Sequence, residues 1–94
     1  MAFFPLFALA FATPVASGPY YSAEPATPPT RERFVARENI WRCSAGTCVS
    51  PRSASRPAIV CSTLVREVGA LRSFSVEGQP FAVEALESCN RRAR

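Results

Sequence analysis

The stretch that decides the fold is WRCSAGTCVS, Trp41–Ser50. Cys43 and Cys48 flank the tetrapeptide SAGT, in which Gly46 can adopt the positive φ that a tight hairpin turn requires. The stretch therefore predicts a β-hairpin in which the two cysteines lie opposite each other. Side chains alternate along a strand, so Trp41 shares a face with Cys43, and we expect it to pack in the core over the sulfur atoms. An exposed ligand platform is the alternative role for this tryptophan.

The remaining cysteines extend this interpretation to two disulfides. The four cysteines are Cys43, Cys48, Cys61 and Cys89, and four cysteines allow three pairings. Geometry favours Cys43 with Cys48 across the hairpin, and Cys61 with Cys89 on the inward faces of two helices. A zinc site usually has two close cysteine pairs, and a redox centre usually has C-x-x-C at a helix N-terminus. A small zinc protein and a thiol-dependent redox protein are therefore alternatives to the disulfide interpretation.

Two helices are predicted after the hairpin. Pro57 suits a first helical turn, with Ser55 or Arg56 as the cap and Gly69 as the stop. The spacing predicts a first helix with five inward side chains: Ala58, Cys61, Leu64, Val65 and Val68. The second helix is expected over residues 82–90, with three inward side chains: Ala82, Leu86 and Cys89.

The other strand-forming stretches set the fold class. Phe34–Cys43 is rich in strand formers, with a turn or bulge at the polar ARENI in its middle. LRSFSV, with Phe74 and Val76 in register, predicts one more strand before a turn at Glu77–Gln79. The expected fold is α+β: a small antiparallel sheet, made of a hairpin plus one strand, with two helices packed on one face and disulfides as staples.

Three segments divide the chain. Residues 1–17 hold an apolar run, residues 2–12, that is too short for a transmembrane span, and they offer cleavage sites at Ala10 and Ala12 or at Val15 and Ser17, which predicts a signal peptide. Residues 18–32 hold many prolines and little to bury, which predicts an extended tether. Residues 33–94 are then a single small α+β domain. Export permits disulfides, so the leader and the cysteine count support each other.

The charge favours anionic partners. Eleven basic residues, all arginine, face seven glutamates, for a net charge of +4. The sharpest candidate anion site is SPRSASRP before the first predicted helix, where a helix N-terminus attracts anions. Its candidate residues are Arg52, Ser53, Ser55 and Arg56. A polar connecting loop with an ordinary helix cap is the alternative.

Catalysis has little support in the sequence. The chain contains neither histidine nor aspartate, which excludes a Ser-His-Asp arrangement. Its glutamates fall in predicted turns, polar helix faces and the tether, where solvated surface is the simpler interpretation. No glycine-rich phosphate loop is present. We therefore predict no enzyme, no catalytic residue, no metal, no cofactor and no specific nucleic-acid partner.

Several motifs resemble one family. They are Trp41-x-Cys43 with Cys48 after it, Ser55-Arg56-Pro57-Ala58-x-Val60-Cys61, Ser73-Phe74-x-Val76-x-Gly78 and Leu86-x-x-Cys89-Asn90. Over residues 34–90 the chain resembles a family of small, uncharacterised, exported alphaproteobacterial proteins. The family has a Gly-Asp pair where this chain has Arg37-Glu38-Asn39. The resemblance implies export and a shared fold, and it implies no activity.

Together these observations predict a periplasmic or secreted protein. Its expected role is a binding or structural module of the cell envelope. An anionic envelope component or another envelope protein is the expected kind of partner.

Overall fold

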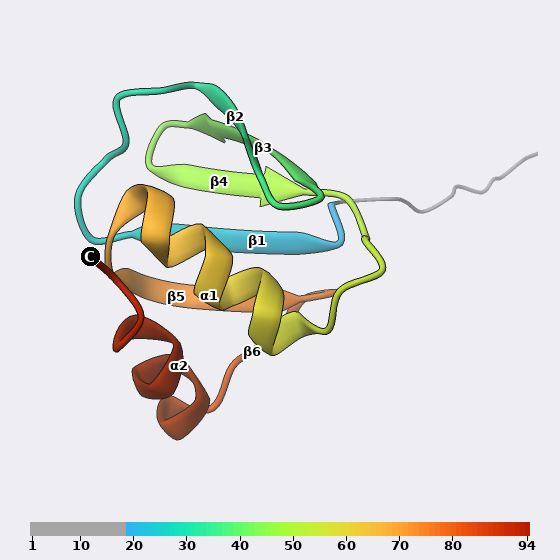
Figure 1. The fold of residues 1–94 in the computed structure, drawn as a ribbon, viewed down its shortest axis with the longest axis vertical. Helices are drawn as coiled ribbons and strands as arrows, with labels where there is room; N and C mark the ends of the chain where they lie inside the picture. The colour runs from blue at the N-terminus through green and yellow to red at the C-terminus, as the bar shows by residue number, and fades with distance from the viewer. Residues whose placement is uncertain (1–18) are drawn as a thin grey trace, which may run out of the picture.

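The computed structural model describes residues 19–94, and the predicted signal peptide, residues 1–17, lies outside the described residues (Figure 1). The strands are β1 (Tyr21–Pro25), β2 (Arg33–Ala36), β3 (Asn39–Ser44), β4 (Thr47–Ser50), β5 (Leu71–Val76) and β6 (Gln79–Pro80). The helices are α1 (Pro57–Val68) and α2 (Val83–Asn90). The α+β class is confirmed.

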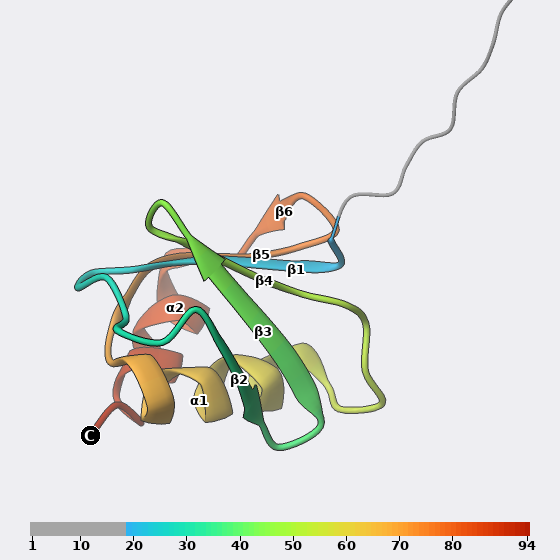
Figure 2. The same cartoon turned by 90° about the horizontal axis from the view of Figure 1, so that it is seen from above.

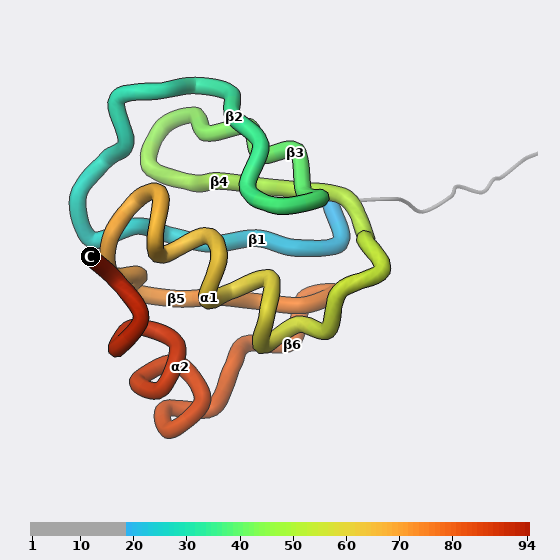
Figure 3. The backbone as a smooth tube through the Cα atoms, viewed as in Figure 1, coloured from blue at the N-terminus to red at the C-terminus, as the bar shows by residue number. Residues whose placement is uncertain are grey.

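The strands form one six-stranded antiparallel sheet in the order β2-β3-β4-β1-β5-β6. This sheet is larger than the predicted hairpin plus one strand. The predicted tether over residues 18–32 is wrong for Tyr21–Pro25, because β1 lies in the middle of the sheet (Figures 1 and 3). Pro25 is tolerated because it is the last residue of β1, where the register shifts and no N–H donor is needed.

Tight turns join three pairs of neighbouring strands, β2 with β3, β3 with β4 and β5 with β6. The turn between β3 and β4 has positive φ at Gly46, as predicted, and also at Ala45. The ARENI segment forms a second turn, between β2 and β3, with Arg37 at a φ of 64°. A third turn, at Glu77 and Gly78, leads into β6. The two-residue turn at Arg37 and Glu38 therefore divides the predicted strand-forming stretch, Phe34–Cys43, between β2 and β3.

Both helices cover the same face of the sheet, and β2 and β3 curve toward α1 (Figure 2). Helix α1 begins after Arg56 and ends at Gly69, as predicted, and it buries four side chains: Val60, Cys61, Leu64 and Val65. The predicted inward position of Ala58 is wrong, because this residue is exposed and Val60 takes its place in the core.

Helix α2 is attached by its last turn. Cys89 is its one buried side chain, Leu86 packs partly against the core, and Ala82, predicted inward, is exposed. The Asn90 side chain accepts a hydrogen bond from the Leu71 N–H at 2.8 Å and donates one to the Leu71 carbonyl at 3.0 Å. The start of this helix therefore has few anchors.

The core lies between the sheet and the helices. Trp41 is 0% exposed, which confirms its predicted packing, and it neighbours Tyr21, whose ring centroid is 6.4 Å away. Tyr21 also packs on Phe74. Alternation then directs the remaining strand residues to the opposite face of the sheet, which neither α1 nor α2 covers (Figure 2).

Candidate functional site

Two arginines lie side by side on this open sheet face. Arg33 of β2 is the register partner of Arg42 of β3, and Arg42 in turn is the partner of Val49 of β4. Both arginines are exposed. Like charges directly opposite each other on a sheet are unfavourable unless an anion lies between them. The pair is therefore a candidate anion-binding element.

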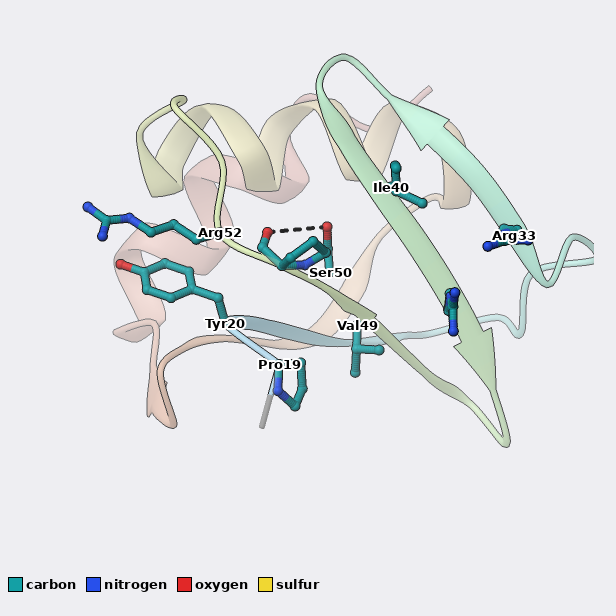
Figure 4. A pocket seen from close by; sticks show the side chains of 9 residues that line it. Pro19, Tyr20, Arg33, Ile40, Val49, Ser50 and Arg52 are labelled. Atoms are coloured by element: carbon teal, nitrogen blue, oxygen red, sulfur yellow. Dashed lines mark hydrogen bonds between the residues drawn. The ribbon is translucent and has the colours of Figure 1, made fainter. Parts of the chain in front are cut away.

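A groove of about 510 Å³ passes beside this pair (Figure 4). Its charged lining is Arg33, Arg42 and Arg52, and its apolar lining includes Tyr20, Ile40 and Val49. Figure 4 shows Arg33 and Arg52 at opposite ends, with Val49 and Ser50 between them. An anionic chain with apolar parts matches this lining.

No carboxylate lines the groove as the described residues form it. The one ion pair within residues 19–94 joins Arg31 to Glu67 at 2.9 Å, away from the groove lining. Glu38 accepts a hydrogen bond from Ser55, and Glu24 accepts one from Ser73. Glu32 lines a separate hollow together with Arg33 and Arg42. The charged side chains that line the groove are therefore all basic.

The end of the groove near Tyr20 is built from aromatic rings. The Arg52 guanidinium carbon lies 5.6 Å from the centroid of the Tyr20 ring, within cation–π range. Tyr20 packs edge-on against Tyr21 at 4.8 Å. Burial raises the pKa of the Tyr21 phenol above 10.0, and Tyr20 raises it further, while Arg52 lowers it. Tyr21 therefore acts as a neutral core residue beneath the groove.

The residues of the predicted anion site do not converge on one point. The Ser53 hydroxyl donates to Asn39 Oδ1 at 2.9 Å, and the Ser55 hydroxyl donates to Glu38 Oε2 at 2.6 Å. Arg56 is the N-cap residue of α1 and makes no side-chain cap hydrogen bond. Both serine hydroxyls thus already have acceptors within the chain. Of the four candidates, Arg52 lines the groove.

Asn39 is the polar residue that fixes this linker. It is buried, and its Nδ2 donates to Ser50 Oγ at 3.0 Å and to the Pro51 carbonyl at 3.2 Å. With the bond from Ser53, the side chain ties the start of β3 to the segment after β4. These contacts position Arg52 relative to the sheet.

The disulfide pairing is confirmed. Cys43 is bonded to Cys48 across the hairpin, with Cα atoms 3.9 Å apart, and Cys61 is bonded to Cys89 between the helices, with Cα atoms 6.0 Å apart. Such bonds are typical of proteins that fold in an oxidising environment. No described helix is long and apolar enough to cross a bilayer.

The sequence interpretation missed most of the groove. Arg42 and Ile40 were treated only as strand residues, Arg33 only as the start of the domain, and Tyr20 was placed in the tether. The sequence does contain a pattern that indicates the groove. In RFVARENIWR, an arginine, an aromatic residue and a β-branched residue precede Arg37 and Glu38, and the same three kinds of residue follow them in reverse order. A two-residue turn at that centre brings the two arginines together.

Fold and groove define a class: a small, disulfide-bonded α+β protein with one helix-covered sheet face and one open basic face. The chain belongs to the family of unknown function DUF8200, whose model matches residues 5–91. This match extends beyond the residues that carry the motifs. Neither a curated protein nor a solved structure matches the chain.

Proposed function

We propose that this protein is an exported binding module of the cell envelope, periplasmic or secreted, that holds an anionic ligand on its open sheet face. One observation carries the proposal: Arg33 and Arg42 oppose each other in a groove without a carboxylate. A bound anion would relieve the repulsion between the two guanidinium groups, and planar forks of this kind bind carboxylates and phosphates well. The role is binding without catalysis.

Export is supported by the two disulfides and by the apolar residues 1–17. Cleavage after Ser17 would leave Gly18, Pro19 and Tyr20 ahead of β1. Pro19 and Tyr20 line the groove, so the mature chain would keep both of these lining residues. N-terminal sequencing of the exported protein tests this step, and recovery of Met1 would contradict it.

The binding test is a titration with sodium phosphate and sodium sulfate, followed by NMR of the amide and guanidinium N–H groups. We expect the largest shifts at Arg33 and Arg42, and weaker binding as salt rises, because exposed charges are screened over about 8 Å at physiological ionic strength. The double variant Arg33→Gln/Arg42→Gln should bind at least fivefold more weakly. Its melting temperature should be unchanged or slightly higher, because a like-charge pair is removed.

The matched control is Arg91→Gln/Arg94→Gln, which removes the same charge from exposed residues that do not line the groove. It should leave phosphate binding unchanged. Equal binding by the wild-type protein and the Arg33→Gln/Arg42→Gln variant would refute the site. Equal losses in both double variants would show that net charge alone attracts the anion.

A further inference from the structure

Strand β2 has one unpaired edge. It is the end strand of the sheet, and β3 lies beside it on one side only (Figure 4). The Cys43 N–H donates to the Glu32 carbonyl at 2.8 Å, so Glu32 and Cys43 form a hydrogen-bonded pair. Alternation along an antiparallel ladder then directs the N–H and C=O groups of Arg33 and Val35 away from β3. These groups can pair with an added strand.

The same edge carries an apolar pair. Val35 is 62% exposed and Ile40 is 49% exposed, and the two are register partners next to the Arg33 and Arg42 pair. An edge strand that only needs protection from aggregation would carry charge or proline at such a position, not an exposed valine. The open end of the sheet therefore offers a charged position and an apolar position, two residues apart.

We propose that the occupant is an extended acidic segment of a partner protein that adds to β2 as an antiparallel strand. This inference rests on the proposed function and names its ligand. A residue opposite Arg33 points to the open face, and so does a residue opposite Val35. In an antiparallel partner the residue opposite Val35 comes first, so the segment has the order apolar-x-acidic.

Backbone and side-chain chemistry favour this occupant over a membrane surface. The outward N–H and C=O groups of Arg33 and Val35 need hydrogen-bond partners that an extended backbone supplies and a bilayer surface does not. The apolar pair of Val35 and Ile40 favours a protein side chain over a sugar. Backbone groups at the edge of β2 supply affinity, and the two side-chain positions supply specificity, as in other cases of strand addition.

The test uses the full mature protein and capped peptides in which valine and glutamate are separated by one threonine and flanked by threonines. The order valine-threonine-glutamate should shift the amide resonances of Arg33 and Val35. The reversed order, of the same composition, should bind about fivefold more weakly, because one ion pair and one apolar contact cannot form together. N-methylation of the valine or glutamate amide should abolish binding, whereas methylation of the central threonine amide should not.

Protein variants separate this inference from the proposed function. Val35→Thr keeps a β-branched side chain outside the groove lining and should weaken the peptide at least fivefold while phosphate binding persists. Arg33→Gln/Arg42→Gln should weaken both ligands. Phosphate binding together with equal affinity for both peptide orders, or with no peptide binding, overturns the strand-addition inference alone. Binding to vesicles of anionic phospholipid with no peptide binding overturns it in favour of a membrane surface.

Discussion

Removal of the Cys61–Cys89 disulfide should destabilise the protein more than removal of Cys43–Cys48. The two bonds close loops with sequence separations of 28 and 5 residues. The chain-entropy relation gives about 3.5 kcal/mol for the longer loop and about 2 kcal/mol for the shorter one. All four cysteines are nearly fully buried, so truncation to alanine leaves similar cavities in both cases.

The assay compares the melting temperatures of Cys61→Ala/Cys89→Ala and Cys43→Ala/Cys48→Ala. A difference of about 1.5 kcal/mol corresponds to roughly 6–12 °C for a domain of this size, with the interhelical variant melting lower. Hydrogen exchange adds a local readout. Helix α2 buries only Cys89 and is too short to be stable alone, so its amides should lose protection first.

The reverse ranking, or equal melting temperatures, would refute this reasoning. It would mean that the hairpin bond stabilises the native state through contacts rather than through the unfolded chain. Full protection of α2 in the Cys61→Ala/Cys89→Ala variant would show that Asn90 and Leu86 hold the helix without the disulfide.

Three further predictions follow from the strands. A chain that lacks residues 19–25 should give no cooperative melting transition by circular dichroism, because β4 and β5 both lose their partner β1. Ala45→Asn should raise the melting temperature by a few degrees, because asparagine tolerates the φ of 53° that this turn position requires. Tyr21→Phe should reduce the loss of stability above pH 10. The pKa of Tyr21 is higher in the folded protein than its unfolded value of about 10, so the neutral phenol stabilises the fold below that value. This stabilisation is lost as the pH rises through the folded pKa, and phenylalanine has no such loss.

The sequence predicted those features whose determining residues lie close together in the chain. The SAGT turn joins adjacent strands, and α1 has its proline at the start and its glycine at the end. The interhelical disulfide followed from helical periodicity, since Cys61 and Cys89 fall on inward faces. Each of these features depends on residues within one element or one turn.

β1 was missed because its partners are remote in sequence. Tyr21 pairs with Ser50 and with Val76. Both partners are far from Tyr21 in the sequence, so no local pattern in this segment indicates the pairing. The prolines in this segment led to the prediction of a tether, although Pro25 lies where the strand ends. The groove was missed for the same reason, since Tyr20 reaches it only because β1 is central.

The Cys43–Cys48 disulfide also affects the arginine pair of the candidate site. Cys43 follows Arg42 in β3, and Cys48 precedes Val49 in β4, so the bond holds the register that places Arg42 beside the groove. We therefore expect Cys43→Ala/Cys48→Ala to weaken phosphate binding at temperatures well below its melting transition. The Cys61→Ala/Cys89→Ala variant, which loosens α2 on the far face, should retain binding there while it remains folded. Equal phosphate affinity in the two variants would show that the turn and the Asn39 contacts alone fix the arginine pair.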